Sequence, residues 1–163
     1  MITLVLGGNR SGKSEVAERL AAATGEPISY VATADASAEG FGPRIDAHRA
    51  RRPATWVTVE QPVDLPGTLM RLEGTVLVDS LGMWVATAPG FGADVEGLAC
   101  ALTRRLGSTV LVSDEVGLGV HPPTEIGVQF ADALGACNRR IAEVSDRVVL
   151  VVAGRTLELP REI

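Results

Sequence analysis

The sequence has few residues that could bind a metal ion or form a disulfide. Its 163 residues include only two cysteines and two histidines. Cys100 and Cys137 lie in segments with helical patterning and belong to no CxxC motif or Cys/His cluster, so we expect no zinc site. We expect both to be buried free thiols, as is usual in a reducing cytosol. His121 stands in a loop before two prolines, where we expect a solvated side chain.

Features of secreted, membrane-spanning and nucleic-acid-binding proteins are also missing. The start, MITLVLGG, is too short for a signal peptide and lacks basic residues, and no apolar run approaches the roughly 20 residues of a membrane helix. A net charge of −5 argues against a nucleic-acid partner. Hydrophobic residues make up 46% and charged residues 21%, as in globular proteins. We therefore expect one cytoplasmic domain, residues 1–163.

Short apolar runs alternate with helical patterns along the chain. Strands are expected at 2–6, 27–33, 55–60, 75–80, 108–115, 147–152 and 156–159. Helices are expected at 13–23, 94–106 and 127–145, with a further short helix within 34–54. Continuous apolar strands between helices predict an α/β fold with a mostly parallel sheet and helices on both faces. Only residues 153–155 separate the last two strands, so these should form an antiparallel hairpin.

The strongest motif is GGNRSGKS, residues 7–14, which matches G-x-x-x-x-G-K-[ST] between a predicted strand and a predicted helix. Its residues are Gly7, Gly8, Asn9, Arg10, Ser11, Gly12, Lys13 and Ser14. Backbone amides of such a loop surround phosphates at the start of the helix. We expect Lys13 to reach the β- and γ-phosphates of a nucleotide and Ser14 to bind Mg²⁺. This predicts a P-loop NTPase fold of the RecA-like type.

P-loop enzymes usually hold the metal with a carboxylate at the end of another strand. Asp79 closes the predicted strand TVLVD and is the first candidate, while Asp114 and Glu115 follow STVLVS and are the second. Each of the three could instead be a strand-end residue that caps a turn.

The remaining histidine, His48, lies in RIDAHRARRPATW, residues 44–56. The arginines around it are Arg44, Arg49, Arg51 and Arg52. These cations attract anions and favour the neutral imidazole, which is a competent nucleophile. The residues alone also allow a solvated histidine on a polar helix.

Seven segments together resemble a known family. They are GGNRSGKS, YVAT, RIDAHRARRPATWVTVE, VLVDSLGMW, VSDEVGLGVHP, FADALGACNRR and VVLVVAG. The chain resembles, nearly end to end, the bifunctional adenosylcobinamide kinase / adenosylcobinamide-phosphate guanylyltransferase of cobalamin biosynthesis. The P-loop is shared by a vast superfamily, whereas the histidine motif followed by W-x-T-x-E and E-V-G-x-G is much more specific.

The resemblance implies a two-step activity with Mg²⁺ and with ATP or GTP as substrates. A nucleoside triphosphate would phosphorylate adenosylcobinamide, and His48 would then carry GMP from GTP to the phosphorylated product. The other residues implied at the nucleotide site are Thr33, Ala34, Asp35, Arg49, Ala50, Arg51, Arg52, Glu60 and Asp79. Glu60 would contact the guanine nucleotide, and Asp79 would lie at the nucleotide site. The resemblance also implies a homotrimer with a corrinoid substrate.

The chain departs from the family pattern at several positions. Asp114 stands where many relatives have asparagine, Ala136 where arginine is common, and Ala47 where a polar residue is frequent. We expect these departures to bear on corrinoid binding and not on the chemistry of the P-loop or His48. Two other functions remain open from the residues: a simple small-molecule kinase, and a non-catalytic nucleotide-binding regulator. We expect Trp56 and Trp84 to pack in the interior.

Overall fold

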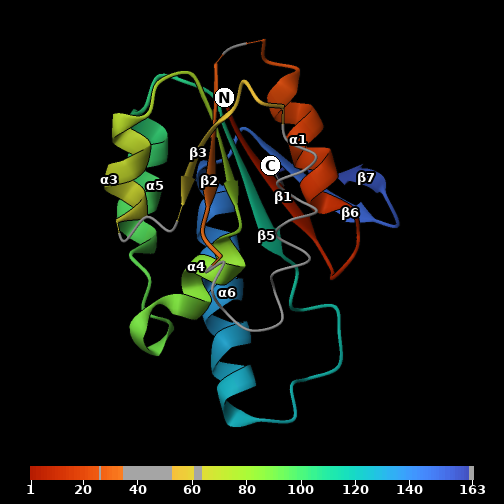
Figure 1. The fold of residues 1–163 in the computed structure, drawn as a ribbon. Helices are drawn as coiled ribbons and strands as arrows, with labels where there is room; N and C mark the ends of the chain where they lie inside the picture. Colours follow the sequence, from red (N-terminus) through yellow and green to blue (C-terminus); the bar gives the residue numbers. More distant parts are fainter. Residues whose placement is uncertain (26, 35–52, 61–63, 162–163) are drawn as a thin grey trace.

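The computed structural model describes residues 1–25, 27–34, 53–60 and 64–161 (Figure 1). The strands within this part of the chain are β1 (Ile2–Gly7), β2 (Ile28–Ala32), β3 (Val57–Glu60), β4 (Thr75–Asp79), β5 (Thr109–Asp114), β6 (Arg147–Val152) and β7 (Arg155–Glu158). The helices are α1 (Lys13–Ala22), α3 (Leu65–Arg71), α4 (Leu81–Thr87), α5 (Val95–Arg104), α6 (Glu125–Val144) and the short 3-10 helix η1 (Pro89–Phe91). All strands expected from the sequence are present. The short helix expected within 34–54 lies outside the described residues.

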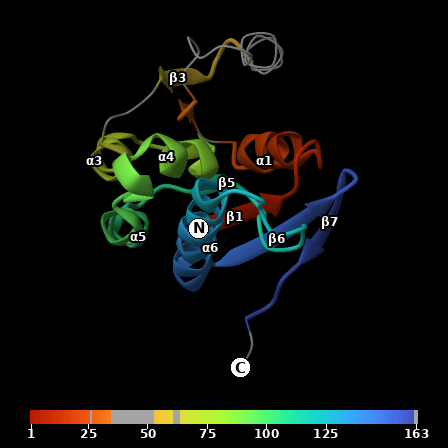
Figure 2. The ribbon, with the colours of Figure 1, turned by 90° about the horizontal axis from the view of Figure 1, so that it is seen from below.

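These strands form one seven-stranded sheet in the order β3-β2-β4-β5-β1-β6-β7. Every neighbouring pair is parallel except β6 and β7, which form the expected antiparallel hairpin. Ala153 and Gly154 occupy its turn with φ of 51° and 75°, the positive values that a tight hairpin turn requires. Figures 1 and 2 place this hairpin at the opposite end of the molecule from α3 and α5. The predicted α/β fold is confirmed.

Alternate residues of the apolar strands face two separate hydrophobic cores. On one face, Leu4, Val78 and Leu111 pack with buried residues of α3, α4, α5 and α6. On the other face, Val5, Leu77 and Val112 pack against Val16, Ala17 and Ala21 of α1. Burial on both faces explains why the strands are continuous apolar runs and not alternating ones.

Helices α3 and α4 were not among the elements expected from the sequence. Each has seven residues, which is too few for a clear helical period. Their starts are nevertheless marked by capping residues. Asp64 accepts a hydrogen bond from Gly67 N at 2.8 Å, and Ser80 accepts one from Met83 N at 3.4 Å. The caps could have revealed both helices.

The two cysteines differ from each other. Cys137 is buried in the core, and its burial raises the pKa of the thiol to about 12. Cys100 is exposed, so the expectation that both thiols are buried is wrong for this residue. The reason is amphipathicity: α5 turns Leu98, Ala99 and Leu102 to the core and Cys100 to solvent.

The expectations for Trp56, Trp84 and His121 are confirmed. Trp84 lies in one core, and Trp56 packs against the other. His121 is exposed. In the part of the chain that the structure describes, no helix is both long and apolar enough to cross a bilayer.

Candidate active site

The carboxyl ends of the six parallel strands meet at one edge of the sheet. In the β1–β5 register Gly7 stands opposite Asp114, and in the β2 registers Ala32 stands opposite both Asp79 and Glu60. In open α/β sheets, ligands bind outside this edge. The sequence-predicted residues of the P-loop and the strand-end carboxylates are therefore brought to the same side of the molecule.

The P-loop connects the end of β1 to the start of α1. Arg10 and Gly12 have φ of 57° and 90°, so the loop turns sharply before Lys13. Gly12 occupies the N-cap of α1 and provides no side-chain hydrogen bond, whereas α3, α4, α5 and α6 each have a side-chain cap. The first amides of α1 can therefore donate to an anion, and the helix dipole favours negative charge there.

Neighbouring segments hold this loop in shape. Gly154 N, in the β6–β7 turn, donates to Ser11 O at 2.8 Å, and Ser11 N donates to Gly8 O at 3.2 Å. A Cβ atom at Gly7 would lie 2.4 Å from Ser11 Oγ and 2.9 Å from Val151 O. Glycine is thus required at position 7 by the close approach of the loop.

The side chain of Lys13, the first residue of α1, is only 7% exposed. Its Nζ lies 2.7 Å from Asp114 Oδ1 and donates to Gly8 O at 3.2 Å. A cation buried to this degree requires such partners. The ammonium group is therefore held at the mouth of the loop by a carboxylate from the adjacent strand.

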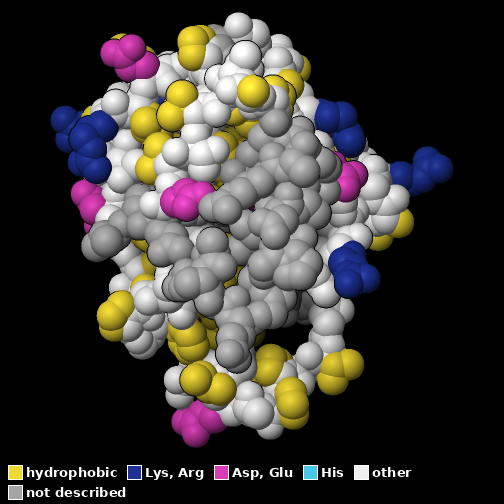
Figure 3. All heavy atoms as spheres, viewed as in Figure 1, with side chains coloured by type: hydrophobic (Ala, Val, Ile, Leu, Met, Phe, Trp, Pro, Cys, Tyr) yellow, Lys and Arg dark blue, Asp and Glu magenta, His cyan; other side chains and the backbone are white. Residues whose placement is uncertain are grey.

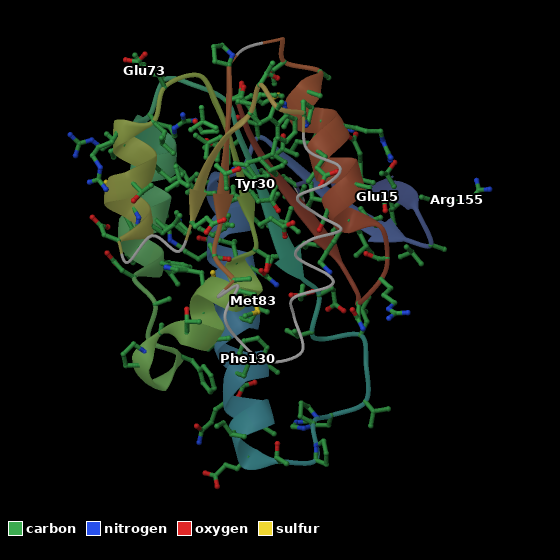
Figure 4. The ribbon with its side chains drawn as sticks, in the orientation of Figure 1. Glu15, Tyr30, Glu73, Met83, Phe130 and Arg155 are labelled. Carbon is green, nitrogen blue, oxygen red and sulfur yellow. The ribbon has the colours of Figure 1, made fainter. Side chains whose placement is uncertain are left out.

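Asp79 ends β4, one strand beyond β5. Its Oδ2 accepts a hydrogen bond of 2.8 Å from the hydroxyl of Tyr30, a residue 2% exposed that is labelled in Figure 4. Thr33 Oγ1 donates to Ser80 O at 2.6 Å and accepts from Ser80 N at 2.8 Å. These bonds hold the ends of β2 and β4 together, so the position of the Asp79 carboxylate is well determined.

The carboxylates of Asp114 and Glu115, at the end of β5, bind different partners. Glu115 accepts hydrogen bonds from Gly117 N at 2.6 Å and Leu118 N at 3.0 Å, so its carboxylate organises its own loop. Asp114 instead reaches Lys13. Of the pair that the sequence could not separate, Asp114 is the one that contacts the P-loop.

Two residues at this edge were not singled out by the sequence. They are Tyr30, described above, and Asn138 of α6. Ser113 Oγ donates to Asn138 Oδ1 at 2.6 Å, and Asn138 Nδ2 donates to Asp114 O at 2.9 Å. Asn138 thus joins α6 to the end of β5. The only sequence signal for Asn138 was that it is a polar residue between apolar positions of a long helical pattern.

The donor set at this edge fits Mg²⁺. In P-loop proteins the ion keeps several waters and takes only a few protein oxygens. The described residues contain no cluster of three or more His, Cys, Asp or Glu side chains. The hydroxyl of Ser14, in the first turn of α1, and the carboxylate of Asp79 are hard oxygen groups of the kind that would hold the ion here.

Comparison with known proteins identifies the family of this chain. The family described as cobinamide kinase / cobinamide phosphate guanyltransferase matches residues 3–159. The chain belongs to this family. The resemblance inferred from its motifs is therefore confirmed.

Curated relatives match at nearly full length. The bifunctional adenosylcobalamin biosynthesis protein CobP of Pseudomonas aeruginosa is 42% identical over 172 residues, covering 99% of each chain. Proteins of the same description named CobU, from Escherichia coli and Salmonella typhimurium, are 32% and 34% identical and cover 94% of this chain and 97% of their own.

Solved structures of more distant proteins share the fold. The flagellar accessory protein FlaH from Methanocaldococcus jannaschii aligns with a TM-score of 0.55 at 13% identity, covering 95% of this chain and 74% of its own. The RadB recombinase aligns with a TM-score of 0.50 at 16% identity, covering 91% and 73%. At these identities the likeness concerns the fold alone.

Not every expected site residue of this family member can be placed. Asp35, His48, Arg49, Ala50, Arg51 and Arg52 lie outside the described residues. Glu60 is exposed at the end of β3, which β2, β4 and β5 separate from β1. At about 4.8 Å per strand, Glu60 is on the order of 19 Å from the P-loop strand across the sheet. Glu60 and Lys13 therefore mark two distant parts of the same edge.

Proposed function

We propose that this chain carries out both steps of its family, phosphorylating adenosylcobinamide and then transferring GMP from GTP to adenosylcobinamide phosphate. One observation carries the proposal: an uncapped helix start and a buried lysine lie beside strand-end carboxylates, in a chain that matches the family from residue 3 to residue 159. The kinase step releases a nucleoside diphosphate, and the guanylyl step gives pyrophosphate and adenosylcobinamide-GDP.

In the kinase step the substrate hydroxyl oxygen attacks the γ-phosphorus of the triphosphate. The bond to the bridging β–γ oxygen breaks, and the hydroxyl proton is lost to solvent. Lys13 and the amides at the start of α1 stabilise the negative charge on the phosphates. Ser14 and Asp79 would hold Mg²⁺, which neutralises further charge on the phosphate oxygens when it is bound.

In the guanylyl step His48 attacks the α-phosphorus of GTP, and pyrophosphate leaves. The phosphate of adenosylcobinamide phosphate then displaces the histidine from that phosphorus. Arg49, Arg51 and Arg52 would bind the triphosphate, and Glu60 would bind the guanine nucleotide. The remaining proposed nucleotide contacts are Thr33, Ala34, Asp35 and Ala50.

The connectivity of the chain supports this assignment. Ala34 follows β2 at the carboxyl edge of the sheet, the edge that also carries Gly7 and Asp79. The segment with His48 begins directly after Ala34 in sequence. Glu60, the other guanylyl-transfer residue, ends the neighbouring strand β3.

The test is covalent labelling with GTP carrying a radioactive α-phosphate. We expect one acid-labile, base-stable label per chain, as for a phosphoramidate. His48→Ala and His48→Asn should lose the label and guanylyl transfer while keeping kinase activity. His121→Ala is the matched control, because it removes the only other histidine and His121 is exposed.

Guanylyl transfer retained in His48→Asn would show that the histidine only positions the triphosphate. Kinase activity without any GMP labelling of the wild type would favour a simple kinase on the same scaffold.

We further propose a cytoplasmic homotrimer with small-molecule substrates and no nucleic-acid partner. On the face shown in Figure 3, the described Lys and Arg side chains lie apart and form no continuous basic patch. Light scattering coupled to size-exclusion chromatography measures the oligomeric state; a monomer mass near 17.0 kDa would contradict the trimer.

A further inference from the structure

Lys13 already has an anionic partner within the protein. Its Nζ lies 2.7 Å from Asp114 Oδ1, and the lysine side chain is 7% exposed while that of Asp114 is 40% exposed. A nucleotide phosphate that binds Lys13 must therefore compete with a carboxylate. At this distance the attraction between the two charges is substantial in a partly desolvated site.

The fold holds the Asp114 carboxylate in this position. Asp114 stands opposite Gly7 in the parallel register, directly beside the P-loop strand. Its backbone carbonyl accepts from Asn138 of α6 at 2.9 Å. Gly82 of α4 leaves the space for its second oxygen, because a Cβ there would lie 2.5 Å from Asp114 Oδ2. The carboxylate is thus confined between the P-loop and α4.

This position lies between the P-loop and Asp79. Strand β5 separates β1 from β4, so the end of β5 faces the space between Lys13 and the Asp79 carboxylate. A nucleotide whose β-phosphate binds Lys13 brings its negative charge next to Asp114. Like charges at such a distance repel unless a cation lies between them.

We propose that Asp114 makes nucleotide binding depend on the divalent cation, by competing for Lys13 and by repelling nucleotide that carries no metal. This rests on the proposed function in one respect, namely that the P-loop binds nucleotide phosphates. When Mg²⁺ accompanies the nucleotide, the ion compensates the Asp114 charge and the penalty falls. Asp114 is thus a specificity-determining residue for the metal-bound nucleotide. Asp79 should act in the opposite direction, because it favours only the metal-bound form.

The test measures the Kd of GDP, and of ADP in parallel, by titration calorimetry at constant ionic strength. Each is measured with Mg²⁺ and with EDTA, in the wild type and in Asp114→Asn. We expect Asp114→Asn to tighten metal-free binding by about tenfold, the factor that corresponds to a change of about 1.4 kcal/mol. Binding with Mg²⁺ should change by less than about threefold. The ratio of the Kd in EDTA to the Kd with Mg²⁺ should therefore be smaller in Asp114→Asn than in the wild type.

Glu115→Gln is the matched charge control. It removes one negative charge at the next residue, but Glu115 binds its own loop amides and not Lys13. We expect its ratio to stay within about twofold of the wild type. Asp114→Ala, with folding checked by circular dichroism, should reproduce the fall seen in Asp114→Asn.

An unchanged ratio in both Asp114 variants, or an equal fall in Glu115→Gln, would overturn the inference about Asp114. The phosphate site itself is tested separately. If the wild type binds neither GDP nor ADP under any condition, or if Lys13→Ala binds both as well as the wild type does, the proposed nucleotide function fails instead.

Discussion

The two ends of the parallel strands are built in opposite ways. At the amino end, Arg105 donates hydrogen bonds to the carbonyl oxygens of Leu69, Leu72, Gly74 and Ser108 and to Thr109 Oγ1. At the carboxyl end, the cation Lys13 lies beside the Asp114 carboxylate and is the first residue of α1, whose start has no side-chain cap. At the amino end, Arg105 binds carbonyl groups of the protein itself. At the carboxyl end, Lys13 and the first amides of α1 are placed where they can bind an anion.

This difference separates stability from activity along a single sheet. Arg105 connects the segment after α3 to the end of α5 and the start of β5, so its bonds contribute to folding. Lys13, in contrast, makes contacts that a substrate can exchange. Changes at the amino end should therefore reduce stability and leave the activity unchanged. Changes at the carboxyl end should reduce the activity and leave stability nearly unchanged.

The largest effect should come from Lys13→Ala. We expect kinase activity to fall by about 10³-fold or more, since the lysine neutralises charge on the transferring phosphoryl group. The thermal unfolding temperature should change little, because the lost partner, Asp114, is 40% exposed and can be hydrated. Kinase assays and calorimetry measure the two quantities. A kinase rate near that of the wild type would show that the P-loop does not bind the phosphates in the kinase step.

The second largest effect should come from Arg105→Ala at the opposite end. Removing its guanidinium leaves several partly buried carbonyl groups without their donor, so we expect a loss of about 2–4 kcal/mol in the free energy of unfolding. Kinase activity per folded molecule should stay within about twofold of the wild type. Urea unfolding at a temperature where both proteins are folded provides the measurement.

Arg104→Ala is the control for that experiment. Arg104 is the neighbouring arginine and is exposed at the last turn of α5. Its replacement by alanine removes the same charge as Arg105→Ala does. We expect a change within about 0.5 kcal/mol. Equal losses of stability in the two variants would mean that general charge, and not the Arg105 hydrogen bonds, stabilises the amino end.

The sequence predicted the carboxyl end better than the amino end. GGNRSGKS is a contiguous motif, and Asp79 and Asp114 close apolar runs, so all three could be placed at strand ends. Arg105 binds residues up to 36 positions away in sequence, and no local pattern reveals such bonds. The short helices α3 and α4 were missed because seven residues make only about two turns, fewer than the window of roughly 11–18 residues in which a helical period is recognised.

Within the site itself, the sequence predicted which residue types are present but not how they pair. It ranked Asp79 first and the pair Asp114 and Glu115 second as candidate carboxylates, and it could not separate the two members of that pair. Only the sheet order shows that β5 is adjacent to β1, which brings Asp114 to Lys13. The Tyr30 hydroxyl was missed for the same reason, since 49 residues separate it from Asp79.

The smallest of these effects should come from Tyr30→Phe, which changes the carboxyl end without touching Lys13. The Tyr30 hydroxyl donates to Asp79 Oδ2 at 2.8 Å, and the residue is 2% exposed. Without this donor the Asp79 carboxylate is less restrained, so the Mg²⁺ concentration for half-maximal kinase activity should rise by about three- to tenfold, as is typical when a residue that orients a metal ligand is lost. At saturating Mg²⁺ the kinase rate should return to near the wild-type value, which a purely structural defect would not allow. Asp79→Asn should shift the same titration further, because it removes the charge itself. A Tyr30→Phe titration identical to that of the wild type would show that Tyr30 only packs beneath the site, and the carboxyl end would then depend on Lys13 and its strand-end carboxylates without this second layer of support.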